Sequence, residues 1–139
     1  MKHVTLLAIE NALASSITIP LEMIEAAEVI QRIRLRRRDQ HRFVIASADG
    51  AALPMVGGIR VQPELGLAAI VHTDLIFIPA LWGNPNAVVQ ANPAITAWLR
   101  RQYAQGATLC SVGTGSYFLA EAGLLDGRNA TTHWYYFDD

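Results

Sequence analysis

The sequence predicts an α/β fold built on one doubly wound parallel sheet. Short apolar runs alternate with segments of helical periodicity along the 139-residue chain, and this alternation is typical of βαβ units. The apolar runs are nearly continuous, as expected of strands that are buried on both faces. Ligands of such sheets bind beyond the carboxyl ends of the strands, so we expect any binding site in the loops that follow them.

The amino-terminal half predicts two strands, a crossover helix and a hairpin arm. Residues 4–9 and 43–46 are the apolar runs of the two strands. Helical spacing continues to about Arg38, with Pro20 expected in the first turn of the helix. A double glycine at 57–58 precedes a short alternating segment, which indicates a hairpin arm where dimer contacts are common.

The carboxyl-terminal half continues the alternation. Residues 74–79 and 107–112 predict two further strands, and Asn92-Pro93 opens the helix between them, which ends at Gly106. A tight turn at 113–115 then leads into a helix that runs to Gly123. The candidate site is therefore set by three loops, residues 11–16, 80–85 and 113–115.

Composition limits the class of protein. Hydrophobic residues make up 52% and charged residues 17% of the chain, which predicts a large core or a sizeable partner surface. The net charge of −1 and the lack of a DNA-binding motif indicate that this segment alone does not bind DNA. Cys110 is the single cysteine, so an intrachain disulfide is excluded. No signal peptide or membrane-length apolar run is present, so we expect a cytoplasmic protein without membrane contact.

Arginines gather toward the end of the first predicted helix, at positions 32, 34 and 36–38. Cations at this end interact favourably with the helix dipole, which favours a solvated helix end. The alternative is a patch that contacts phosphate or DNA.

Residues 110–134 read CSVGTGSYFLAEAGLLDGRNATTHW. This segment resembles the ThiJ/PfpI domain of AraC-family transcription regulators, where it looks like S-V-C-T-G-A-F-x-L-A-x-A-G-L-L-D-G-R-x-A-T-T-H-W. The match is long and ungapped, and it extends more weakly to residues 20–22 and 75–79. The resemblance implies a flavodoxin-like three-layer sandwich of the class I glutamine amidotransferase-like type.

The catalytic positions of the family depart from its pattern here. Family enzymes carry a cysteine on the sharp strand-to-helix turn, a carboxylate four residues before the proline of the first helix, and a nearby histidine. This chain has Gly113 at the nucleophile position and Ser16 at the acid position, so the resemblance implies no catalytic residues and no enzyme activity. Cys110 is expected to be a small buried hydrophobe, because it lies three residues before the turn inside an apolar strand.

The loops supply the expected ligand contacts. The turn that opens the last helix can hold an anionic group on N–H groups and hydroxyls, although simple helix capping explains it equally. Trp82, which follows the predicted strand at residues 74–79, can cap a pocket or only pack. His133, the histidine of the family motif, can line the pocket or be a hydrogen-bonded structural residue. The predicted ligand-binding residues are Ser16, Trp82, Gly113, Thr114, Gly115 and His133.

Neither a metal nor a cofactor is expected. His3, His41 and His72 are scattered along the chain without metal-ligand spacing, and Cys110 is distant from them in sequence.

Three functions remain open. The first is a non-catalytic sensory and dimerisation domain, spanning residues 1–139, that binds a small-molecule effector as a homodimer. The resemblance implies that a separate helix-turn-helix domain, outside these residues, reads DNA. The second is a ThiJ/PfpI-type cysteine-dependent amidase, hydratase or glyoxalase, and the third is a purely structural dimerisation module. Family domains continue beyond the His-Trp segment, so we expect either truncation at the C-terminus or a shortened relative that covers an exposed sheet edge by association.

Overall fold

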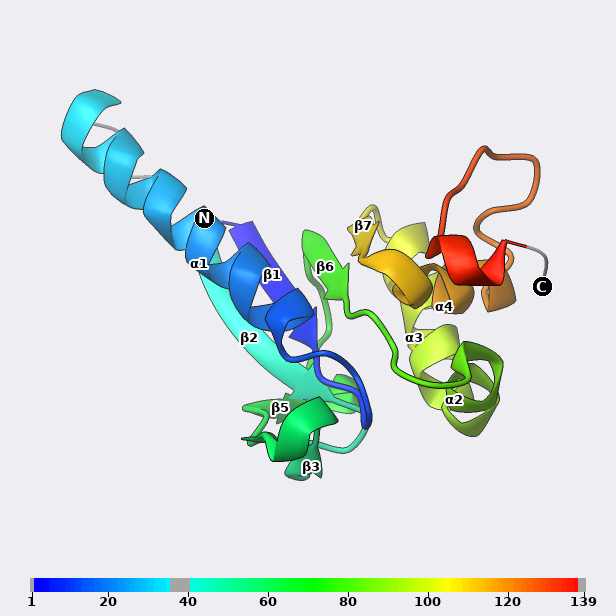
Figure 1. The fold of residues 1–139 in the computed structure, drawn as a ribbon. Helices are drawn as coiled ribbons and strands as arrows, with labels where there is room; N and C mark the ends of the chain where they lie inside the picture. Colours follow the sequence, from blue (N-terminus) through cyan, green and yellow to red (C-terminus); the bar gives the residue numbers. More distant parts are fainter. Residues whose placement is uncertain (1, 36–40, 138–139) are drawn as a thin grey trace.

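Five parallel strands form the central sheet; the sequence predicts the parallel arrangement and four of these strands, and it does not predict the short strand Leu65–Gly66. The computed structural model describes residues 2–35 and 41–137. The strand order is β5-β2-β1-β6-β7, with all neighbouring strands parallel (Figure 1). The strands are β1 (Lys2–Leu7), β2 (His41–Ser47), β5 (Leu65–Gly66), β6 (Leu75–Ile78) and β7 (Thr108–Ser111).

The centre of the sheet is the most deeply buried part of the chain. β1 lies between β2 and β6 and pairs with β2 from Lys2↔His41 to Leu7↔Ala46. Leu6 and Leu7 are completely buried, because neighbouring elements cover both faces of this strand. The predicted alternation of continuous apolar strands with helices is therefore confirmed.

Helices flank this sheet. The described α-helices are α1 (Ser15–Ile30), α2 (Pro85–Ala91), α3 (Pro93–Ala104) and α4 (Ser116–Glu121). In Figure 1 the end of α1 projects beyond the strands, whereas α2, α3 and α4 gather on the side of β6 and β7. Each described helix falls short of the length or the apolar character that crossing a bilayer demands.

The start of α1 differs from the prediction. The helix begins at Ser15, so Pro20 lies inside it and not in its first turn. The chain turns earlier because the backbone N–H groups of Ser16 and Ile17 already donate to Leu13 and Ala14. Its far end passes into a π-helical turn, Gln31–Leu35. The continuation to Arg38, and with it the arginines at 36–38, lies outside the described residues.

The sequence-based prediction does not include helix α2. It assigns residues 80–85 to a loop and names no element between this loop and Asn92. Asn84 is the N-cap of α2, since the side chain accepts a hydrogen bond from the N–H of Ala87 at 3.2 Å. Pro85 stands at the first helical position, where proline costs no hydrogen bond. The Asn-Pro pair was therefore a readable signal for a helix start.

The hairpin arm and the exposure of β7 test two further expectations. β3 (Leu53–Pro54) and β4 (Arg60–Val61) pair antiparallel around the predicted glycine turn, so the hairpin is confirmed.

The expectation that Cys110 is buried is wrong, since its side chain is partly exposed. β7 pairs with β6 alone among the described strands, so one side of β7 has no neighbouring strand to bury it.

Candidate ligand-binding site

The three predicted loops meet at the carboxyl ends of the strands. The loop after β1 is joined to the loop after β6 by two backbone hydrogen bonds, Leu13 N to Ala80 O at 2.9 Å and Trp82 N to Asn11 O at 3.0 Å. A β-bridge links Ala12 to Leu81 between them. These contacts fix the relative position of segments that lie about 70 residues apart, so the site has a rigid base.

Thr114 attaches the third loop to the other two. Its hydroxyl donates to the carbonyl of Leu81 at 2.8 Å and accepts from the N–H of Leu81 at the same distance. The side chain is buried, and both hydrogen bonds are internal. Thr114 therefore lies in the site mainly as a clamp between the turn after β7 and the loop after β6.

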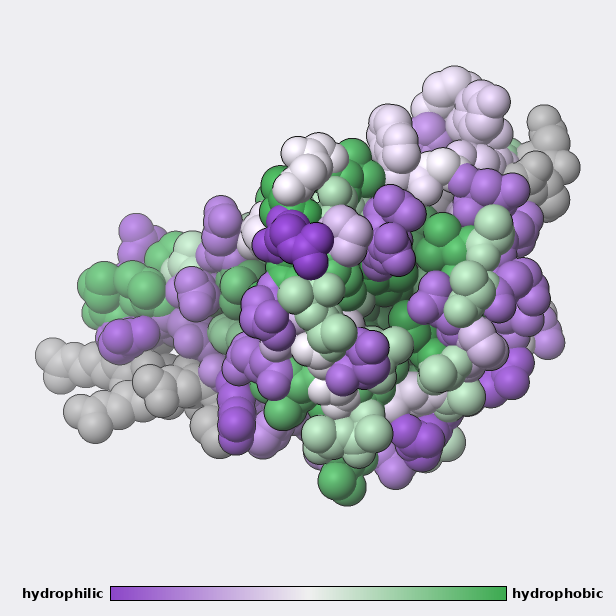
Figure 2. Space-filling model, turned by 90° about the horizontal axis from the view of Figure 1, so that it is seen from below, coloured by the Kyte–Doolittle hydropathy of each residue, from purple (hydrophilic) through white to green (hydrophobic). Residues whose placement is uncertain are grey.

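A pocket of about 540 Å³ opens above these loops. That volume lies within the usual range for small-molecule sites, roughly 300–1,000 Å³. Its lining is mostly apolar and aromatic, and His133 is its only titratable group apart from the tyrosines. Figure 2, which views the face at which β1 and β2 end, shows hydrophobic residues around a hollow near its centre. The lining residues are Leu13, Ala80, Leu81, Trp82, Gly83, Gly113, Thr114, His133, Tyr135 and Tyr136.

The segment that follows the family motif closes one side of the pocket. The Tyr136 hydroxyl donates to the carbonyl of Gly83 at 2.6 Å, which ties the end of the described chain to the loop after β6. The Tyr136 ring also meets that of Tyr117 edge-on, with centroids 6.2 Å apart. Tyr135 and Tyr136 were not predicted as site residues. The run of aromatic residues directly after His133 was the available signal.

Gly113 occupies the sharp turn that the sequence predicts. Its φ is +48°, in the left-handed region that favours glycine. A Cβ added there would meet only the Cβ of Ala80, at 3.8 Å. The turn therefore has room for a side chain, and this room opens into the pocket that Gly113 lines.

Trp82 and His133 both line the pocket. The Trp82 side chain remains 63% exposed, so most of its ring surface is open to a ligand or to solvent. His133 is also exposed, and its Nδ1 accepts a hydrogen bond from the N–H of Tyr135 at 3.3 Å. The two interpretations of His133, pocket residue and hydrogen-bonded structural residue, are thus compatible.

Ser16 and Gly115 lie behind the pocket wall and do not line it. The buried Ser16 hydroxyl donates to Leu13 O at 2.5 Å and accepts from Ala80 N at 3.0 Å. A Cβ on Gly115 would come within 2.6 Å of the carbonyl oxygen of Pro79. The N–H groups of Gly115 and Ser116 donate within the turn itself. These groups position the loops, and an anion gains no free donors from them.

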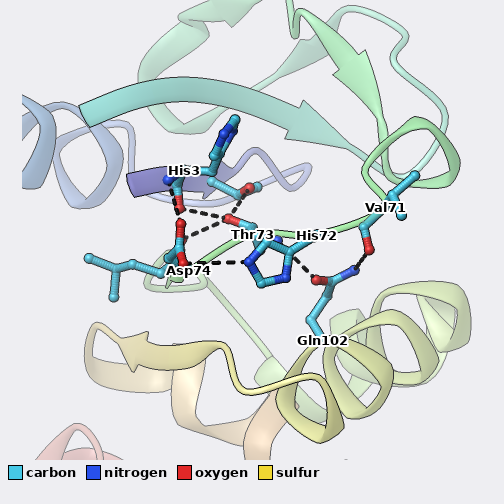
Figure 3. Close-up of polar contacts among 8 residues, drawn as sticks. His3, Val71, His72, Thr73, Asp74 and Gln102 are labelled. Carbon is cyan, nitrogen blue, oxygen red and sulfur yellow. Dashed lines mark hydrogen bonds and ion pairs between the residues drawn. The ribbon is translucent and has the colours of Figure 1, made fainter. Parts of the chain in front are cut away.

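Cys110 is not among the residues that line this pocket. No group of three or more potential metal ligands occurs in the described part of the chain. The Asp74 carboxyl group accepts a hydrogen bond from the backbone N–H of His3 and lies beside the ring of His72 (Figure 3).

Family membership follows from the sequence over most of the chain. The family model of the DJ-1/PfpI family matches residues 16–139. This chain belongs to the DJ-1/PfpI family. The match includes the strand-turn-helix segment around Gly113 and the histidine segment that closes the pocket.

Two curated relatives illustrate the range of the family. The HTH-type transcriptional regulator CdhR of Pseudomonas aeruginosa is 38% identical over 111 residues, which are 80% of this chain and 32% of CdhR. The isonitrile hydratase of Pseudomonas putida is 35% identical over 81 residues, 58% of this chain and 35% of the hydratase. This chain therefore spans about a third of the length of these relatives.

Solved structures confirm the fold. A protein from Vibrio parahaemolyticus assigned as a transcriptional regulator superposes with a TM-score of 0.83 at 26% identity, covering 98% of this chain and 69% of that protein. An AraC family transcriptional regulator from Pseudomonas putida gives a TM-score of 0.77 at 24% identity, covering 97% and 68%. The predicted resemblance to ThiJ/PfpI domains of AraC-family regulators is confirmed.

Proposed function

We propose that this chain is the non-catalytic sensory domain of an AraC-family transcriptional regulator, acting in the cytoplasm as a homodimer. The observation that carries the proposal is Gly113. At the turn where family enzymes carry the nucleophile, this chain has a glycine with a φ of +48°, and the turn opens into a pocket of about 540 Å³. These two features support a turn that receives a ligand in place of a nucleophile.

The pocket suits a small organic molecule with an apolar body. Trp82 and Tyr135 offer ring faces for that body, and aromatic rings bury much area at low entropic cost. Bound ligand would bridge the loop after β6 and the segment around Tyr136, which are joined by the hydrogen bond from the Tyr136 hydroxyl to the Gly83 carbonyl. An effector acts as a switch only if it binds one of two arrangements of the protein more tightly. We expect the two arrangements to differ in how the segment around Tyr136 lies against the loop after β6.

DNA contact belongs to a separate domain. The net charge of −1 gives this chain no general attraction to phosphates. Regulation would pass from ligand to DNA through the geometry of the dimer.

A stripe on α1 supports the homodimer. Ile19, Met23, Ala26 and Ile30 follow one another at spacings of 4, 3 and 4 residues, as in a coiled-coil seam, and all four are exposed. Met23 is 67% exposed. Figure 2 shows hydrophobic surface at the projecting end of this helix. Contiguous exposed apolar surface on a soluble protein often marks a site of protein–protein interaction.

Charges beside the stripe favour a second copy of the same helix in antiparallel orientation. Glu22 and Glu25 flank the first half of the stripe, whereas Arg32 and Arg34 flank its far end. Antiparallel pairing places the acidic half of each copy against the basic half of the other, and parallel pairing would oppose like charges.

Matched tryptophan variants test ligand binding. Trp82 lines the pocket, whereas Trp134 does not, and both are largely exposed. Small organic compounds would be screened by thermal shift against the 139-residue chain, and hits measured by calorimetry. We expect Trp82→Ala to weaken a hit at least tenfold, about 1.4 kcal/mol, and Trp134→Ala to leave it unchanged. Equal effects of the two variants would place the ligand outside this pocket, and a screen without hits would favour the purely structural module.

The second candidate function is a cysteine-dependent or water-activating enzyme, favoured by the similarity to the isonitrile hydratase. Its candidate groups are Cys110 and His133. Cys110 lies outside the pocket lining, which counts against it, although its side chain is partly exposed. Rapid alkylation of Cys110 at neutral pH, at rates typical of an activated thiolate, would support the enzyme, and slow alkylation leaves it without a nucleophile.

A further inference from the structure

A second hollow lies at the opposite, amino-terminal edge of the sheet. Its volume is about 380 Å³. One wall is the face of β1 and β2 that carries Thr5 and Val44, and the other is the segment of residues 65–72 that runs between β5 and β6. The lining residues are His3, Val4, Thr5, Arg42, Val44, Leu65, Ala69, Ile70, Val71 and His72.

The polar rim of this hollow carries donors that have no protein partner. His3 and Arg42 are register partners on adjacent parallel strands, so their side chains leave the same face about 4.8 Å apart. Within residues 2–35 and 41–137, no hydrogen bond or ion pair engages the Arg42 guanidinium or the His3 ring. A guanidinium presents a planar fork of N–H groups that matches a carboxylate.

Among the described residues, the neighbouring carboxyl group, that of Asp74, forms no ion pair with Arg42. It is absent from the lining of the hollow. One of its oxygens accepts from the backbone N–H of His3 at 2.7 Å, and the other lies 3.4 Å from His72 Nε2. Figure 3 shows the His72 ring facing Asp74, whereas the His3 ring extends away from it. Both oxygens of the Asp74 carboxyl group are therefore occupied by contacts with His3 N–H and the His72 ring.

The outer wall is held in place by a buried amide. Gln102 of α3 is fully buried; its Nε2 donates to the carbonyls of Ile70 and Val71 at 3.3 and 3.2 Å, and its Oε1 accepts from Thr73 N at 3.2 Å. The Thr5 hydroxyl donates to that of Thr73 at 3.0 Å, so the wall is also fastened to β1. A hollow between fastened walls is preformed, which reduces the entropic cost of binding.

We propose that this hollow binds an organic carboxylate with a short apolar chain. The carboxylate accepts hydrogen bonds from Arg42 and His3 at the rim, and the chain lies against Val44, Leu65 and Ile70. Both parts of the ligand contribute, because the rim supplies charge and the walls supply apolar area. This site is separate from the pocket at the carboxyl ends of the strands and does not depend on the function proposed for that pocket.

Hexanoate is a suitable probe, with hexanol and acetate as matched ligands that lack the charge or the chain. Binding to the 139-residue chain would be followed by calorimetry or by NMR shifts of β1 and β2 amides. We expect hexanoate to bind at least tenfold more tightly than either matched ligand. Equal binding of hexanol would remove the role of the rim, and equal binding of acetate that of the walls, and either would overturn the proposal.

Variants locate the probe. Arg42→Gln removes the fork and Ala69→Phe, at an exposed position, fills the hollow, so each should weaken hexanoate at least tenfold. Arg60→Gln, an exposed arginine of β4 outside the hollow, is the charge-matched control and should bind as the parent does. Trp82→Ala should also bind hexanoate normally. Loss of binding in Trp82→Ala with retention in Arg42→Gln would assign the carboxylate to the other pocket and refute this one.

Discussion

At the scale of single residues, two glycines of one turn have opposite reasons to be glycine. Gly113 has a positive φ and open space beyond its Cα, whereas Gly115 packs against the backbone of β6 at its carboxyl end. Gly113 is required by its positive φ. Gly115 is required because a Cβ would come too close to neighbouring backbone atoms. Sequence reasoning placed both in the ligand site, and the structure separates a lining position from a packing position.

Alanine at each position measures this difference. Gly113→Ala should cost about 1 kcal/mol of unfolding free energy, the usual strain of a non-glycine residue in the left-handed region. Gly115→Ala should cost about 3 kcal/mol, because its Cβ would meet the carbonyl oxygens of Pro79 and Ile78 at 2.6 and 2.8 Å. Urea denaturation of the two variants is the measurement. A larger loss for Gly113→Ala would contradict the assigned roles.

Asp74 predicts a dependence of stability on pH. The backbone N–H of His3, followed by the hydrogen bond and charge of His72, lowers the pKa of Asp74 from its ordinary value of 3.8. A carboxyl group with a lowered pKa in the folded state stabilises the fold above its unfolded pKa, and the contribution is lost as pH falls through the folded value. Stability should therefore decline below about pH 4.

Asp74→Asn isolates this contribution. The variant should be less stable than the parent at pH 7 and should lose less stability between about pH 4 and pH 2, as measured by thermal unfolding across that range. Glu10→Gln, an exposed carboxyl group in the loop after β1, is the control. Parallel profiles for Asp74→Asn and the parent would show that Asp74 does not contribute.

At the scale of elements, the apolar stripe of α1 makes the most direct prediction. Met23→Glu places a charge in the middle of the exposed seam and should shift the chain from dimer to monomer in analytical ultracentrifugation, with at least a tenfold weaker dimer. Val71→Glu adds the same charge at an apolar position that is 81% exposed elsewhere and should leave the dimer intact. A monomeric parent, or dissociation by both variants, would contradict the α1 interface.

The sequence predicts some elements well, for physical reasons. The continuous apolar runs identify β1, β2, β6 and β7, and the Asn-Pro start and glycine end correctly bracket α3, which buries Trp98, Leu99 and Gln102. These patterns are local consequences of burial. Helix α2 was missed because it is only 7 residues long, too short for helical periodicity to show, so its Asn-Pro start was the available signal.

Features that depend on distant partners were beyond the sequence. Cys110 looks buried from its apolar neighbours, and only the edge position of β7 exposes it. Tyr136 reaches the pocket by a hydrogen bond to Gly83, 53 residues earlier, and Gln102 fixes a wall about 30 residues before it. Such contacts are set by how elements pack, which no local pattern encodes.

At the scale of the whole molecule, the sheet separates two hollows of different chemistry. The one beyond the carboxyl ends is aromatic and closed by the histidine segment, and the one at the amino-terminal edge is apolar with a cationic rim. Family membership explains the place of the first, since the loops after parallel strands converge there. It does not fix the ligand, because function resides in the side chains that line a site.

The most direct test of the central claim is a crystal structure of this chain with a compound selected by the thermal-shift screen. The sensory domain predicts the compound between Trp82, Gly113 and Tyr136, with Cys110 unmodified and outside the pocket. A covalent adduct on Cys110, or a pocket filled by neighbouring side chains with the compound bound elsewhere, would contradict the claim that a vacated catalytic turn now holds a ligand.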